Sequence, residues 1–366
     1  MSGIKSVMLS RTIIMSSITL SLSMLAVECY AASNLKLLND DELSQETGQG
    51  LLNLNYIAPN QSSNPNTDIG FYRLGVEGEI ALNANVNKLQ LGCGGSKGVG
   101  CDIDIDQVRL TGVDATSDTD SGPGTDFLLN NPFIEFAIKN PDSASTREMV
   151  GLRLGALSAL GKMSFGSNAN TASLSDDTGI NSLSGDIGVT VTNAVLNNVK
   201  ACTFQLFGGC QLALSGSATV ANYATTLLAN RSSSFNLTGM SAKASSSLLG
   251  LTLSNVNMNN IPYSTVHQLI VANADGTATS NAYLSLQSQA INWQKVGDGT
   301  WNTTAAQKGW WLSIPETQVS NLTITQEVQL GLIEAGSGAL GIPVNLDAVD
   351  LGQTPVDNCY GGLTFC

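Results

Sequence analysis

Apolar and polar residues alternate with a period of two along most of this chain, which is typical of β-strands with one buried face. Residues 82–112 show the pattern well, because two alternating segments flank a short glycine-rich loop between Cys93 and Cys101. Such an arrangement predicts a β-hairpin in which the two cysteines face each other. The cross-strand pairs would then be Leu91 with Ile103, Leu89 with Ile105, Val86 with Val108, Ala84 with Leu110 and Leu82 with Gly112.

The alternation in this hairpin changes phase at one rung. Odd-numbered positions are apolar next to the loop, and even-numbered positions are apolar beyond Asn87 and Gln107. Because both strands change together, we expect either opposed bulges at this rung or a tip and a base that pack on different neighbours. We expect the apolar residues next to the loop to point away from those beyond it.

The remaining chain repeats the alternation between turns rich in Asn, Asp, Gly and Ser. The predicted fold class is therefore all-β, with elongated, antiparallel, hairpin-rich sheets arranged as a sandwich or an open barrel. Residues 147–160 are the exception, since "REMVGLRLGALSAL" follows residues that can cap a helix. We predict one short helix there.

The alternating region is preceded by two segments of different character. Residues 1–31 have a basic start, an apolar stretch and small residues near Ala32, as a secretory signal peptide does. Lipidation at Cys29 is disfavoured because Glu28 stands where a small residue is needed. Residues 32–50 contain "LNDDELSQETGQG", which predicts a short acidic helix. We divide the rest into β regions 51–200 and 201–366, which are either separate or continuous.

The segment "LNLNYI" begins the first β region. Leu52, Leu54 and Tyr56 share one face of the predicted strand, and two asparagines share the other. It is either an edge strand paired within its own chain or an extension offered to another subunit by strand addition. In the second case the three apolar side chains are the predicted partner-binding residues.

Composition and cysteine content narrow the class of protein. The chain has a net charge of −13 and only 12% charged residues, so nucleic acid and anionic lipid are poor partners. An exported chain enters an oxidising compartment, where closely spaced cysteines form disulfides. Metal binding is disfavoured because the chain has one histidine and no C-x-x-C motif. The predicted disulfides are Cys93–Cys101, Cys202–Cys210 and Cys359–Cys366.

Residues with catalytic potential are sparse. His267 alternates with apolar residues, which favours a structural role over a catalytic one, and we expect neither an enzyme nor a bound cofactor. The acidic positions Asp102, Asp104 and Asp106 are predicted to form a solvated strand face. An acidic glycine-containing loop is a weak candidate for calcium, although it lacks the closing glutamate of a calcium loop. Its carboxylates are Asp114, Asp118, Asp120 and Asp126.

All four tryptophans lie between residues 293 and 311. They either plug the end of a core or form a binding platform, since tryptophan is favoured at interface centres and stacks on sugars. In the second case Trp301, Trp310 and Trp311 are predicted partner-binding residues, and a glycan is a possible ligand.

Several tracts resemble those of the FilA-like pilus-assembly proteins of Acinetobacter and related Gram-negative bacteria. These tracts are "LNDDELSQETGQGLLNLNYIAPN", "IGFYRLGVEGEIALNANVNKLQLGCGGSKGVGCDIDIDQVRLTG", "NPFIEFAIKNPDSASTREMVGLRLGALSALG" and "GINSLSG". Together they cover much of residues 35–190. The resemblance implies a role in fimbria-like surface structures and carries over no catalytic residues.

The functional expectation is an exported structural or assembly component of a fimbria-like appendage. Its partners would be other appendage or outer-membrane assembly proteins, without nucleic acid and without a helical membrane anchor. It would lie in the periplasm, at the outer-membrane surface or outside the cell. The alternatives are a secreted adhesin or carbohydrate-binding module, and an outer-membrane β-barrel, which the aromatic content of 5% disfavours.

Overall fold

The computed structural model describes residues 51–61, 63–114, 124–167, 178–206, 209–332 and 342–355. These residues form strands joined by turns and by the short 3₁₀ helices η2 (Gly95–Lys97), η3 (Ser246–Leu248) and η4 (Tyr263–Thr265), so the all-β prediction is confirmed. The strands are β1 (Leu52–Ile57), β2 (Ile69–Val76), β3 (Glu79–Leu82), β4 (Ala84–Leu91), β5 (Ile103–Thr111), β6 (Phe127–Lys139), β7 (Glu148–Ser164), β8 (Ile180–Thr192), β9 (Val195–Leu206), β10 (Gly209–Val220), β11 (Tyr223–Ser232), β12 (Ser234–Ala244), β13 (Thr252–Pro262), β14 (Gln268–Val271), β15 (Thr279–Ser280), β16 (Tyr283–Gln287), β17 (Gly309–Ser320), β18 (Thr323–Ile324), β19 (Val328–Leu332) and β20 (Ile342–Asp347).

The described strands form a large sheet of thirteen strands and a small sheet of seven. The main path of the large sheet runs β1-β2-β6-β7-β14-β17-β8-β5-β4, and that of the small sheet runs β18-β9-β10-β12-β13-β20. One of the two sheets curves into a half-barrel. Most strand pairs are antiparallel as predicted, but both sheets are mixed, because β17 pairs parallel with β8, and β13 pairs parallel with β20. Parallel pairing needs long crossover connections, which an alternation pattern does not reveal.

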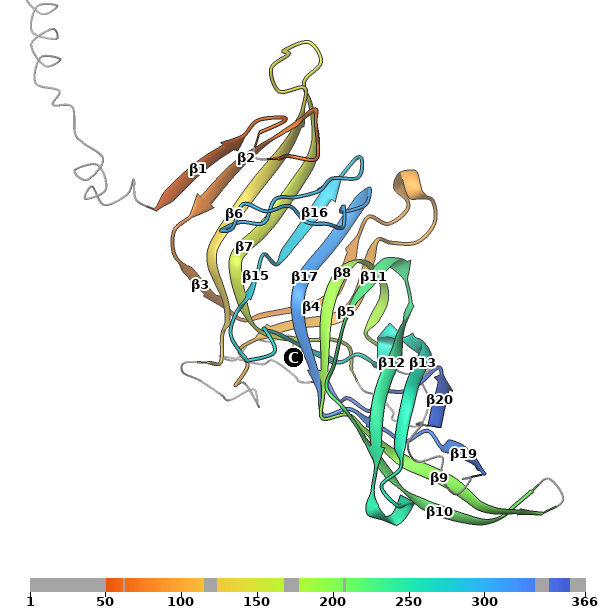
Figure 1. Ribbon diagram of the computed structural model, residues 1–366. Helices are drawn as coiled ribbons and strands as arrows, with labels where there is room; N and C mark the ends of the chain where they lie inside the picture. The colour runs from red at the N-terminus through yellow and green to blue at the C-terminus, as the bar shows by residue number, and fades with distance from the viewer. Residues whose placement is uncertain are drawn as a thin grey trace, which may run out of the picture. The chain divides into compact units, whose positions relative to one another are not determined.

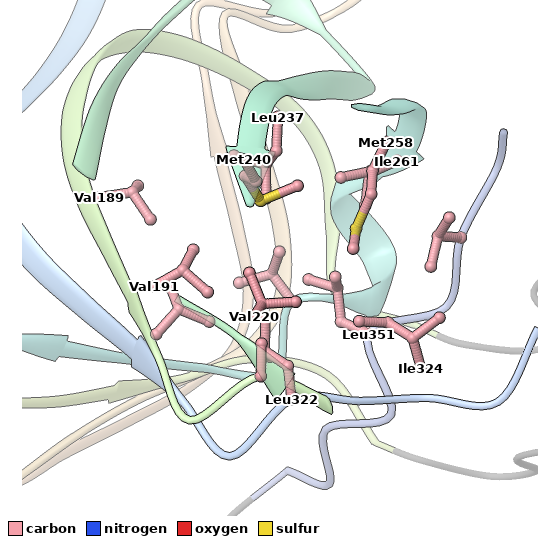
Figure 2. Packing of buried hydrophobic residues seen from close by; sticks show 14 of the residues in the cluster. Val189, Val191, Val220, Leu237, Met240, Met258, Ile261, Leu322, Ile324 and Leu351 are labelled. Atoms are coloured by element: carbon pink, nitrogen blue, oxygen red, sulfur yellow. The ribbon is translucent and has the colours of Figure 1, made fainter. Parts of the chain in front are cut away.

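The two sheets share one apolar core. Figure 2 shows Val189 and Val191 of β8, in the large sheet, beside Leu237 and Met240 of β12, in the small sheet. All four side chains belong to a single buried cluster. A predicted boundary after residue 200 would fall inside β9, and residues 52–366 group as one compact unit. The predicted segments 1–31 and 32–50 lie outside the described residues.

The helix predicted at residues 147–160 is wrong, because this segment belongs to the 17-residue strand β7. Its glycines are explained by close packing. A Cβ on Gly155 would lie 2.7 Å from Phe133 Cζ, and one on Gly161 would lie 2.2 Å from Phe127 Cδ2. Glycine also weakens a helix, so the residues that permit the tight strand packing are those that disfavour the helix.

The predicted hairpin register is confirmed for the four pairs from Ala84–Leu110 to Leu91–Ile103. Leu82 instead lies in β3 opposite Phe127, so its predicted pairing with Gly112 is wrong. Gln107 has a left-handed φ of 48°, at the rung where the alternation changes. On the loop side of this rung β5 pairs with β8 through Asp104 and Ile105, and on the other side it pairs with β7 through Arg109 to Thr111. The β4–β5 register is unbroken across the rung, so the result favours a tip and a base with different neighbours over opposed bulges.

Candidate functional site

β1 lies at the end of the large sheet and pairs on one side only among the described strands (Figure 1). Its partner is β2, with Leu54 opposite Leu74 and Tyr56 opposite Tyr72. β1 is therefore an edge strand of its own chain, which was the first of the two predicted alternatives. Leu52, Leu54 and Tyr56 are nevertheless exposed, and Leu54 is 81% exposed. Among the described residues, nothing pairs with the outer edge of β1 or covers these side chains.

The exposed face of β1 continues across the sheet as two rows of apolar residues. Residues directly opposite each other on paired strands project from the same face, so the register defines each row. We call these rows the apolar stripe. The first row is Leu54, Leu74, Ile134, Leu154, Leu284 and Leu312, and the second is Tyr56, Tyr72, Phe136, Leu152, Leu286 and Trp310.

The apolar stripe contains no charged residue, and much of it is exposed. Leu154 is 46% exposed in the middle of the sheet, and Leu286 is 38% exposed near the far end. Tyr56 and Tyr72 stack with ring centroids 4.4 Å apart, which joins the edge strand to the next strand. A contiguous exposed apolar surface of this kind is typical of an interaction site.

The opposite face of the same strands carries buried charges. Glu135 accepts from Arg73 Nε at 3.0 Å and forms an ion pair with Arg153, and the Arg153 and Glu135 side chains are 0% and 1% exposed. The Arg153 guanidinium lies 4.9 Å from the ring centroids of Phe133 and Trp293. Burial lowers the pKa of Arg73, and Glu135 opposes this effect. These contacts make the inner face a closed core.

The tryptophans divide between the two faces. Trp293 and Trp311 are fully buried, and Trp311 Nε1 donates to Asp186 Oδ1 at 2.8 Å. The prediction of Trp311 as a partner-binding residue is therefore wrong, because its position opposite Ser285 places it on the inner face. Trp301 is half-buried and packs against the inner-face cluster. Trp310 alone of the four belongs to the apolar stripe, where it shares a row with Tyr56.

A cavity of about 480 Å³ opens where the apolar stripe ends at Trp310. Its size is within the range of small-molecule sites. Apolar side chains, three cationic side chains and the carboxylate of Asp102 line it together, so it combines a surface for stacking with an excess of positive charge. The lining includes Met149, Leu152, Leu286, Trp310, Lys97, Arg231, Lys308 and the backbone of the β4–β5 loop.

The tip of the β4–β5 hairpin forms one wall of this cavity. The predicted Cys93–Cys101 disulfide closes the tip. Arg231, from β11, connects the hairpin tip to the sheet. Its guanidinium donates hydrogen bonds to Gly92 O at 2.9 Å and to Gly98 O at 3.1 Å. The wall is therefore fixed by a covalent bond and by a side chain distant in sequence.

Asp102 connects this wall to Trp310. Its Oδ1 accepts from Lys97 Nζ and from Arg231 Nε, each at 2.9 Å, and its Oδ2 accepts from the backbone N–H of Trp310 at 2.9 Å. Burial alone would raise the pKa of Asp102, but these hydrogen bonds hold it below its usual range. The predicted solvated face is therefore wrong for Asp102, which is 2% exposed.

The other acidic and cysteine predictions have mixed outcomes. Asp104 and Asp106 form ion pairs with Lys88 beside the edge strand β4. Asp126 accepts from Asn83, whereas Asp118 and Asp120 of the calcium candidate lie outside the described residues and Asp114 lies at their border. No metal-binding group of three or more ligands occurs in the described part of the chain.

The two other predicted disulfides are only partly described. Cys202 is disulfide-bonded, while the Cys210 side chain, Cys359 and Cys366 fall outside the described part.

Sequence reasoning did not identify Glu135, Arg153 or Arg231. Glu135 and Arg153 are charged residues at alternating strand positions, and Arg231 lies at an irregularity near the end of β11. Solvent exposure is the usual expectation for a charged residue. His267 is buried as predicted for a structural residue, with Nδ1 donating to Phe165 O at 3.0 Å. No signal in the sequence alone distinguished the buried charges from exposed ones, because their partners lie on other strands.

Comparison with known proteins gives no further guide to this site. No family model matches the chain, and neither the curated proteins nor the solved structures include one similar to it. The geometry of the site is that of a partly exposed apolar stripe, which runs from the edge strand β1 to the cavity at Trp310.

Proposed function

We propose that this protein is an exported structural or assembly component of a fimbria-like cell-surface appendage, and that β1 is its point of attachment. The observation that carries the proposal is the exposed, uncharged edge strand, with Leu54 and Tyr56 at the start of the apolar stripe. Strand addition to such an edge supplies main-chain hydrogen bonds, while alternate side chains supply specificity.

The two ends of the large sheet differ in a way that supports this proposal. Exposed edges invite unwanted pairing, and proteins commonly protect them with charged side chains. β4, at one end, carries Lys88, which is paired with Asp104 and Asp106. β1, at the other end, has no charged residue and no proline. The unprotected edge is therefore the one suited to a partner.

One further observation agrees with export. The Cys93–Cys101 disulfide is of the kind that persists in oxidising compartments. Within the described residues, no helix has the length and apolarity needed to cross a membrane. The proposed role is binding and assembly, without catalysis.

The test is Leu54→Lys, introduced into the full-length protein in a Gram-negative host. A lysine at this exposed position places a charge beside the free edge, so we expect export and folding to persist while incorporation into sheared surface material is lost. Leu228→Lys is the matched control, because Leu228 is 67% exposed on β11, away from β1. Equal incorporation of both variants would contradict the proposal.

A carbohydrate-binding role is the second candidate, and the cavity at Trp310 favours it. An aromatic ring beside a cationic side chain suits an acidic glycan, which stacks on the ring and pairs with Lys308. Trp310→Ala should then abolish retention on a column of an acidic polysaccharide. Leu249→Ala, at an exposed apolar position elsewhere, should leave retention unchanged. Retention of both variants would exclude this candidate.

A further inference from the structure

We infer that the partner of β1 is a second copy of this chain, paired antiparallel through β1 with Leu54 opposite Leu54. The inference rests on the proposed function, since it names the partner for the same edge. The two copies would be related by a two-fold axis through the Leu54 pair. An interface of this symmetry needs a surface that is complementary to itself.

The sequence of β1 meets this requirement. Residues 52–56 read Leu-Asn-Leu-Asn-Tyr, so the pattern of apolar and amide side chains is the same in both directions about Leu54. In the proposed register Leu52 lies opposite Tyr56 of the partner subunit, and Asn53 lies opposite Asn55 of the partner subunit. Apolar residues meet apolar residues on one face, and amides meet amides on the other. A shift of the register by one residue in either direction would place Leu54 opposite an asparagine.

Charge favours the same edge for self-association. The chain has a net charge of −13, so two copies repel each other at most orientations. β1 has no charged residue, and neither does the apolar stripe that starts from it. Contact through β1 therefore brings together the surfaces with the least direct repulsion.

The pairing also extends the candidate site. Directly opposed residues on antiparallel strands project from the same face. The first row of the apolar stripe in one copy would thus continue into the first row of the other across the Leu54 pair, and the second row would meet Leu52 of the partner subunit. The two cavities at Trp310 would lie at the opposite ends of one uninterrupted apolar surface, which no single copy presents.

Cysteine crosslinking of the purified full-length protein tests this register. Opposed residues have Cβ atoms about 4.5–5.5 Å apart, so Leu54→Cys alone should form a dimer with a short thiol crosslinker. Leu52→Cys alone should not, because its own copy lies four residues away, about 13 Å along the strand. A mixture of Leu52→Cys and Tyr56→Cys should crosslink. Leu228→Cys is the control for non-specific crosslinking.

The outcomes separate the inference from the proposed function. A wild-type protein that stays monomeric at all concentrations in sedimentation, or Leu52→Cys crosslinking as well as Leu54→Cys, overturns the inference. If Leu54→Lys nevertheless abolishes incorporation at the surface, the function stands and its partner is a different protein. If the Leu54 pair forms but Leu54→Lys is incorporated normally, the proposed function fails while self-pairing holds.

Discussion

The two faces of the strands from β1 to β17 reverse the usual distribution of residues. The inner face buries Glu135 between two arginines, whereas the outer face exposes leucines and tyrosines in the apolar stripe. Burying a charge is unfavourable unless it is paired, and exposing a contiguous apolar surface is unfavourable unless something covers it. The inner face meets its requirement within the chain, whereas among the described residues the outer face stays exposed at Leu54, Tyr56 and Leu154.

This difference separates stability from recognition. Changes on the inner face should reduce the free energy of unfolding, because they leave buried groups without partners. Changes on the outer face should leave that free energy nearly unaltered and act on association instead. The following predictions test this division, beginning with the largest effect on stability.

Glu135→Gln should have the largest effect. It leaves Arg73 and Arg153 close together without a counter-charge, and breaking a buried ion pair by removing one partner costs about 3–5 kcal/mol. Denaturant unfolding monitored by tryptophan fluorescence measures the loss. Glu148→Gln, at an exposed position on β7, is the control and should change little. A loss below about 1 kcal/mol would show that water reaches the inner-face arginines.

Asp102→Asn should have an intermediate effect. It weakens the hydrogen bonds from Lys97 and Arg231, so we expect a loss of about 1–2 kcal/mol at neutral pH. The pKa of Asp102 is lower in the folded protein than in the unfolded chain. Asp102 therefore contributes to the free energy of unfolding above the unfolded pKa of about 3.9, and this contribution disappears as the pH falls through the pKa of the folded protein. The wild type should therefore lose stability more steeply than the variant below about pH 4.

The comparison for Asp102 requires unfolding free energies of both proteins across an acid pH series. Asp104→Asn is the control, since Asp104 interacts with Lys88 nearer to solvent and should contribute at most about 1 kcal/mol. If the free energy of unfolding fell equally with pH for the wild type and Asp102→Asn, the result would contradict a stabilising role of the Asp102 carboxylate.

Leu154→Thr should have the smallest effect on stability. Leu154 lies on the outer face and threonine retains the preference for a strand, so the change should stay within about 0.5 kcal/mol. Val150→Thr, on the same strand but 2% exposed, buries a hydroxyl group and should cost about 1–3 kcal/mol. Similar losses for the two variants, measured by thermal unfolding, would mean that the outer face is as well packed as the inner one.

Sequence patterning predicted the local pairing of the hairpin correctly. The alternation of apolar residues and the spacing of Cys93 and Cys101 located the register from Ala84 to Leu91, because pairs within a hairpin depend on residues close in sequence. The same reasoning failed for β7. Its glycines and leucines are compatible with two periods, and only contacts with Phe133 and Phe127 on β6 select the strand.

The sequence by itself determined that the chain is all-β, that β1 alternates, and that Cys93 and Cys101 are paired. These features follow from periodicity and from short-range spacing. Tertiary structure alone decided which face of each strand is covered: it buried Trp311 on the inner face and left Trp310 partly exposed on the other, and it buried Asp102 beside Arg231, 129 residues away. The physical reason is that the period of a strand defines two faces equally well, and only the neighbours that pack against it determine which face becomes the core.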